Sequence, residues 1–135
     1  MREYVVTCCS TADMSRTFME TNEVPFAMFH YQLDGKEYAD DLYSSISPEV
    51  FYKMIGDGAQ PVTSQVNVEA YCALFEPVLR SGKDVLHLTL SSGISGSINS
   101  ANVAKTQMEE KYPDRRVMVV DSLAASSGYG MLVEQ

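Results

Sequence analysis

The stretch KDVLHLTLSSGISGSINSA, residues 83–101, decides the fold of this chain. Its apolar run from Val85 to Leu90 predicts a buried strand, because apolar side chains fall on both faces of the run. Five serines and two glycines follow within the stretch. Apolar residues then recur at helical spacing, namely Ile98, Ala101, Ala104, Met108 and Tyr112, before Pro113 ends the predicted helix. A strand that turns directly into a helix is the building unit of parallel α/β sheets.

The same unit occurs near both ends of the chain. EYVVTC, residues 3–8, predicts a buried strand that is followed by a polar turn and a helix start around Thr11 to Asp13. RRVMVVDS, residues 115–122, predicts another strand, with Ser122 capping the helix after it. The alternation predicts an α/β, parallel-sheet, Rossmann-like three-layer domain, in which ligands bind at the carboxyl ends of the strands.

In the middle of the chain, the sequence pattern predicts a β-hairpin and two further helices. Residues 24–33, VPFAMFHYQL, predict one strand, and Asp34-Gly35 predicts a tight turn that returns through KEYAD. Ser47 caps a helix that we expect to run to about Gly56. Asn67 caps another, which Pro77 should bend or end early.

Composition and charge exclude several classes of function. The chain has 135 residues, of which 45% are hydrophobic, and its net charge of -8 opposes nucleic-acid binding. No apolar run approaches the roughly 20 residues that span a bilayer, so we expect a cytoplasmic protein without a membrane span. The three cysteines do not predict a disulfide framework, and no Cys/His pattern suggests a metal site or a cofactor.

Three polar loops should lie at the carboxyl edge of the sheet. They are CSTAD (residues 9–13), PVTSQ (residues 61–65) and SSGISGS (residues 91–97). Backbone N–H groups at the start of a helix, together with Ser and Thr hydroxyls, can hold an anion without any lysine or arginine. The loops therefore predict an anion-binding site, although each loop alone could be an ordinary cap or turn.

Two other interpretations of the serine loop compete with this one. A phosphate cradle would require a Walker or dinucleotide-binding glycine motif, and the sequence has neither. A serine-dependent hydrolase acting through Ser92 or Ser95 remains the alternative, although GISGS departs from the G-x-S-x-G spacing. His30 and His87 are the two histidines, and neither occupies an obvious position for a catalytic base.

The motifs STAD, VP, DGKEYAD, FY, PVTSQ, LTLSSGISGS, INSA and VVDS, in this order, resemble the N-terminal domain of the DegV family. The resemblance covers nearly all of residues 1–135. It implies a non-enzymatic bacterial lipid-binding protein that holds a long-chain fatty acid, C14 to C18. It also implies a partner, the fatty acid kinase subunit, which converts the carboxylate to an acyl phosphate for phospholipid synthesis.

Carried onto this sequence, the resemblance implies a set of residues that bind the fatty-acid carboxylate, namely Thr63, Ser64, Ser91, Ser92 and Ser95. The chain departs from the family pattern at Cys9, where an acid is usual, at Val66, where proline is usual, and at Ser97, where threonine is usual. Family members are about twice this length, so we expect a fragment that lacks a second lipid-binding domain.

Overall fold

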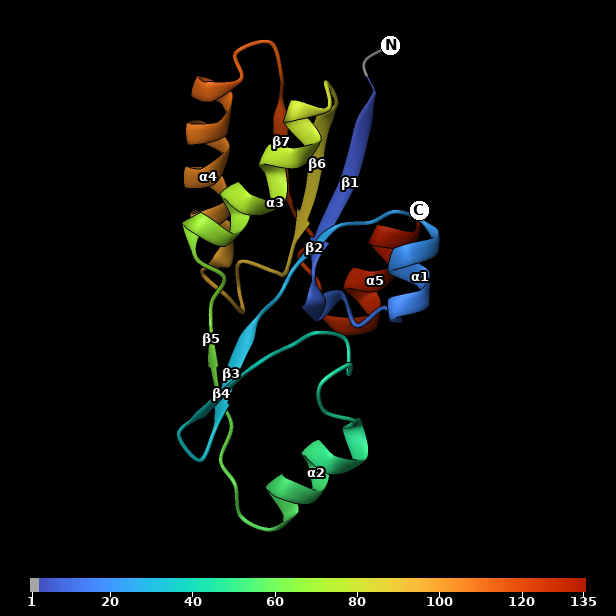
Figure 1. The fold of residues 1–135 in the computed structure, drawn as a ribbon, viewed down its shortest axis with the longest axis vertical. Coiled ribbons are helices and arrows are strands. Elements are labelled where there is room, and N and C mark those ends of the chain that lie inside the picture. The colour runs from blue at the N-terminus through green and yellow to red at the C-terminus, as the bar shows by residue number, and fades with distance from the viewer. Residues whose placement is uncertain (1–2) are drawn as a thin grey trace.

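The computed structural model describes residues 3–135 (Figure 1). Its strands are β1 (Tyr4–Cys9), β2 (Phe26–Ala27), β3 (His30–Leu33), β4 (Lys36–Ala39), β5 (Val62–Ser64), β6 (Asp84–Thr89) and β7 (Val117–Asp121). Its helices are α1 (Arg16–Thr21), α2 (Pro48–Gly56), α3 (Val68–Arg80), α4 (Ser97–Lys111) and α5 (Ser126–Glu134), and a 3₁₀ helix, η1, spans Ser10–Ala12.

The strands form two sheets of opposite kinds. The main sheet has the order β2-β1-β6-β7, and every neighbouring pair in it is parallel. The second sheet has the order β4-β3-β5 and is antiparallel. The predicted α/β class, with a parallel sheet and a β-hairpin, is therefore confirmed.

The core is organised around His87 in the middle of β6. Its ring packs edge-on against Tyr71 and Phe75 of α3, at centroid distances of 5.1 and 5.2 Å. Its Nδ1 lies 2.9 Å from Oγ1 of Thr7 on β1. All four side chains are fully buried. These contacts hold α3 against the central pair of strands.

Helices lie on both sides of the main sheet. Helices α3 and α4 pack on the face that carries His87, whereas α1 and α5 lie beside β1 on the other side (Figure 1). Val117 of β7 is buried, but its neighbour Met118 and then Val120 are 48% and 42% exposed. Within residues 3–135, the second helix layer therefore covers β1 and leaves the outer side of the edge strand β7 open.

Two strands replace the single strand predicted for residues 24–33. β2 pairs with β1 in the main sheet, whereas β3 pairs with β4 and β5 in the second sheet. Between them, the Phe29 N–H donates to Ser10 Oγ at 3.1 Å, and the Phe29 carbonyl accepts from the Asp40 N–H at 2.8 Å. These two long-range hydrogen bonds carry the chain from one sheet to the other.

The hairpin and the cap of α2 are confirmed. Asp34 and Gly35 have φ values of 51° and 79°, as a two-residue turn with two left-handed positions requires. The Ser47 side chain accepts a hydrogen bond from the Val50 N–H, and Pro48 is the first helical residue.

Two predictions about connecting segments are wrong. Residues 61–65 are not a loop, because β5 pairs with β3 and places Thr63 opposite Tyr31. No α-helix starts around Thr11 to Asp13, because η1 ends there and Asp13 adopts a left-handed φ of 53°. Helix α1 begins instead after Ser15, whose side chain caps the Phe18 N–H.

Two predictions about helix ends do not hold in full. Pro77 does not end α3 early, because the helix passes through this exposed residue, which removes a single backbone donor, and continues to Arg80. Ser122 does not cap α5, which begins at Ser126. The Ser122 hydroxyl instead donates to the Ala124 carbonyl at 3.1 Å and closes a local turn.

In residues 3–135, no helix combines the length and the apolar character that crossing a bilayer requires.

We expect two glycines of α5 to respond oppositely to alanine. A Cβ on Gly130 would lie 2.6 Å from Met14 Sδ and 2.7 Å from the Ala12 carbonyl, whereas a Cβ on Gly128 would meet nothing nearer than 3.6 Å. Gly130→Ala should lower the free energy of unfolding by about 1 to 3 kcal/mol through overpacking. Gly128→Ala, the matched control, should raise it by up to about 1 kcal/mol through helix propensity. Urea unfolding measures both, and equal effects would contradict the packing of α5 on η1.

Stability should depend on pH through His87. Burial lowers the pKa of His87 to about 3, from 6.5 in an unfolded chain. As the pH falls, the unfolded state therefore takes up a proton before the folded state does, and the free energy of unfolding falls by about 1.4 kcal/mol per pH unit below about pH 6.5. Between pH 7 and pH 5, the free energy of unfolding should fall by about 2 kcal/mol because of this group. His87→Gln should flatten that dependence, and His30→Gln should leave it unchanged.

Candidate functional site

The serine loop after β6 is closed by bonds that centre on Ser91. The Ser91 carbonyl accepts from the N–H groups of Ile94 and Ser95 at 3.0 and 3.1 Å. The Ser91 Oγ accepts from the Gly93 N–H at 3.2 Å, and its own N–H donates to the Ala124 carbonyl at 3.1 Å. Ser91 is buried. Ser91, one of the predicted site residues, therefore lies at the base of the loop.

Ser92 is directed toward Asp121 at the end of β7. Its N–H donates to Asp121 Oδ1 at 3.2 Å. A hydrogen bond from its side chain is the main cause that holds the pKa of Asp121 below the usual range. The Ser92 hydroxyl proton is therefore shared with a carboxylate of the protein itself.

Ser95 is half-buried at the start of α4, which begins at Ser97 and not at Ser95 as expected. Its Oγ lies 2.9 Å from the Ser97 Oγ and accepts from the Ser97 N–H at 3.2 Å. Gly96 occupies the N-cap position and has no side chain with which to cap the helix. Because its Oγ accepts from the first N–H of α4, the Ser95 hydroxyl lies at this helix N-terminus, where the helix dipole favours an anion.

Thr63 and Ser64 are exposed on β5, and neighbouring strand residues face opposite ways. The Ser64 hydroxyl donates to the His30 carbonyl at 3.4 Å. Thr63 lines a pocket, whereas Ser64 is not among the residues that line it.

The two hydroxyl-bearing segments meet at Gln65 and Gly96. A Cβ on Gly96 would lie 2.9 Å from the Gln65 Oε1 and 3.0 Å from its Nε2, so the Gln65 amide rests directly on the glycine backbone. Segments thirty residues apart in sequence are therefore neighbours in space, below β6 and beside β5 in Figure 1. Gln65 was not among the predicted site residues, although it belongs to the quoted PVTSQ motif.

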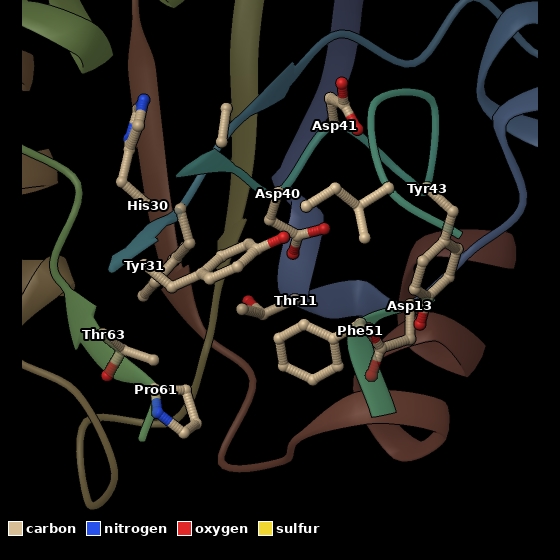
Figure 2. A pocket seen from close by; sticks show the side chains of 13 residues that line it. Thr11, Asp13, His30, Tyr31, Asp40, Asp41, Tyr43, Phe51, Pro61 and Thr63 are labelled. Carbon is tan, nitrogen blue, oxygen red and sulfur yellow. The ribbon is translucent and has the colours of Figure 1, made fainter. Parts of the chain in front are cut away.

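The pocket that Thr63 lines has a volume of about 310 Å³ and lies among the hairpin, α2, β5 and the turn after β1. Its wall includes Phe29, Tyr31 and Phe51, and the last two rings meet edge-on at 5.4 Å. In Figure 2, Tyr31, Phe51 and Asp40 point toward its centre. The walls are thus mainly apolar and aromatic, as a hydrocarbon ligand would require.

Polar groups in this pocket were not predicted as site residues. Asp40 lines it with Asp13, and burial raises the pKa of Asp40, while hydrogen bonds from Ser10 and Leu42 lower it in part. In the described part of the chain, Thr11 Oγ1 is buried in the pocket wall without a hydrogen-bond partner. The motifs STAD and DGKEYAD contain three of these residues and could have indicated them.

The histidines do not lie where a serine nucleophile would need them. His87 is bonded to Thr7 inside the core, and burial keeps it neutral by lowering its pKa. His30 lines the pocket from β3. The side-chain partners of Ser92 and Ser95 are Asp121 and Ser97, so no contact pairs either serine with a histidine in residues 3–135.

Comparison with known proteins gives a family match. The model of the family described as "uncharacterised protein, DegV family" matches residues 5–135. A DegV domain-containing protein of Clostridium perfringens is 34% identical over 133 residues, which make up 98% of this chain and 46% of the relative. The chain thus spans about half the length of the curated relatives it matches.

Two solved structures have the same fold over nearly the whole chain. A DegV family protein from Thermus thermophilus, reported for its fatty acid binding, has a TM-score of 0.86 at 30% identity, covering 99% of this chain and 45% of that one. A stearic acid-binding protein from Eubacterium ventriosum has a TM-score of 0.87 at 30% identity, covering 97% and 45%. The family match and these structural likenesses together show that the chain belongs to the DegV family.

Proposed function

We propose that the protein binds a long-chain fatty acid, C14 to C18, with the carboxylate held between Thr63 and Ser95. The observation that carries the proposal is the contact of Gln65 with Gly96, which brings the two hydroxyl-bearing segments together. The aromatic pocket beside Thr63 and the fatty-acid-binding relatives support the same ligand class.

A carboxylate can be held here by neutral donors. The Thr63 and Ser95 hydroxyls each supply one proton, and the first N–H groups of α4 lie next to Ser95. Ser64, Ser91 and Ser92 belong to the same two segments, but in this proposal they do not touch the carboxylate. The Ser64 hydroxyl donates to the His30 carbonyl, Ser91 is buried, and the Ser92 side chain bonds to Asp121. Because the hydroxyl and N–H donors to the carboxylate carry no charge, they leave it negatively charged.

Most of the affinity would come from the acyl tail. Each buried methylene contributes about 0.8 kcal/mol, so a tail of about fifteen offers roughly 12 kcal/mol when fully enclosed. The pocket of about 310 Å³ is open and provides part of such an enclosure. We expect residues 1–135 on their own to hold a fatty acid weakly, and a longer protein of the relatives' length to hold it more firmly.

We further propose a carrier that presents the carboxylate to a kinase subunit in the cytoplasm, and not a catalyst. Thr63 on one segment and Ser92 on the other are exposed, so a carboxylate between the two segments would be accessible to a second protein. The kinase and the acyl phosphate product rest on the family resemblance.

The ligand can be identified directly. Native mass spectrometry of the protein expressed in bacteria from its complete reading frame should show one co-purified C14 to C18 acid. A protein that is empty, and remains empty when offered these acids, would contradict the proposal.

Alanine substitutions should locate the carboxylate. Thr63→Ala and Ser95→Ala should each weaken palmitate binding by about 1 to 3 kcal/mol, because a charged ligand loses a hydrogen-bond donor. Ser64→Ala is the matched control, since Ser64 bonds to the His30 carbonyl, and it should bind as the wild type does. Titration calorimetry measures all three, and unchanged binding in both test variants would move the carboxylate elsewhere.

Labelling with an active-site probe can test the alternative of a serine hydrolase. A fluorophosphonate probe should not label the protein, because Ser92 and Ser95 have Asp121 and Ser97 as partners and no histidine base. Labelling that is lost in Ser92→Ala or Ser95→Ala would favour the hydrolase over the carrier.

A further inference from the structure

A chain of buried polar side chains leads from the core to Ser95. It begins with Thr7 and His87, whose polar atoms are 2.9 Å apart. The His87 Nε2 lies 3.9 Å from the Cys9 Sγ, and that sulfur lies 3.3 Å from the Tyr71 hydroxyl. All four residues have no exposed surface.

The outer half of the chain passes through Ser97. Burial and the neighbouring Cys9 raise the pKa of Tyr71, and a hydrogen bond donated by Ser97 lowers it in part. The Ser97 Oγ lies 2.9 Å from the Ser95 Oγ. Ser97 is fully buried, whereas Ser95 is half-buried, so the chain ends at the surface where the ligand is proposed to bind.

The members of this chain are neutral at physiological pH. Burial lowers the pKa of His87 to about 3 and raises the pKa values of the Cys9 thiol and of the Tyr71 phenol. Each hydroxyl and the thiol therefore has one proton to donate, and either atom of the Cys9–Tyr71 and Ser95–Ser97 pairs can be the donor. The hydroxyl and thiol protons of these pairs can therefore point either toward the core or toward Ser95.

An anion at Ser95 permits one of these two directions. A carboxylate only accepts hydrogen bonds, so Ser95 must donate to it and must accept from Ser97. With an anion at Ser95, the Ser97 hydroxyl therefore donates to Ser95 and not to Tyr71, the acceptor to which it otherwise donates.

We propose that Ser97 is the positioning residue that makes Ser95 a donor to the bound carboxylate. The inference rests on the proposed function and adds a residue that was not among the predicted carboxylate-binding residues. Ser97 acts twice on the same atom, because its N–H and its hydroxyl both contact the Ser95 Oγ. Position 97 thereby favours acids over alcohols, since an alcohol can itself donate to Ser95 and does not need Ser95 as a donor.

The test compares two ligands with the same tail in the protein expressed from its complete reading frame. Dissociation constants for palmitate and for hexadecanol are measured for the wild type, Ser97→Ala and Ser97→Thr. Ser97→Ala should weaken palmitate binding about tenfold and change hexadecanol binding less than about twofold. Ser97→Thr keeps the hydroxyl and should bind palmitate as the wild type does.

Comparing the two ligands separates positioning from general damage, because a misfolded or loosened variant loses both ligands alike. Ser97→Ala with the wild-type ratio of the two dissociation constants would overturn the role of Ser97 and leave the proposed function standing. Failure of Ser97→Thr to restore the ratio would also overturn it. A wild type that binds hexadecanol and palmitate equally poorly would overturn the proposed function, and the role of Ser97 with it.

Discussion

The burial of one neutral histidine connects the parts of this structure. His87 stands in the middle of β6 and packs against two rings of α3, while its nitrogen bonds to Thr7 on β1. The segment with Thr63 leads into α3, and the serine loop leads out of β6. The contacts of His87 therefore help to position the two hydroxyl-bearing segments, which meet at Gln65 and Gly96. A charged imidazole in this place would be strongly unfavourable, which is why the fold keeps His87 unprotonated.

The site combines a neutral polar end with an apolar wall. With a net charge of -8, the protein repels a carboxylate at long range, but exposed charges are largely screened beyond a Debye length of about 8 Å. In the proposed complex, hydroxyl and N–H donors would stabilise the carboxylate at short range, and the burial of methylenes would supply most of the free energy. Asp121 contributes indirectly, because it holds the Ser92 backbone and the Leu123 backbone on the same carboxylate oxygen. The loop is thereby anchored to β7.

Local signals predicted a good part of the fold. The hairpin at Asp34-Gly35 and the caps at Ser47 and Asn67 were predicted because their determinants lie within four residues of one another. The division of residues 24–33 could not be predicted in this way, since the apolar pattern is the same whichever sheet a strand joins. The choice depends on Ser10 and Asp40, which bond to Phe29 from elsewhere in the chain.

The sequence by itself determined the α/β class, the hairpin, the main helix caps and the chemistry of a site made of hydroxyls and glycines. These depend on residue type and short spacing, which the backbone expresses locally. Only the tertiary structure decided which hydroxyls bond to the protein itself. The Ser92 side chain bonds to Asp121, 29 residues away, and the Ser64 hydroxyl bonds to the His30 carbonyl, 34 residues away, whereas Thr63 lines the pocket. The physical reason is that a hydrogen-bond donor is used up by whichever acceptor the fold brings to it, and sequence distance does not reveal that acceptor.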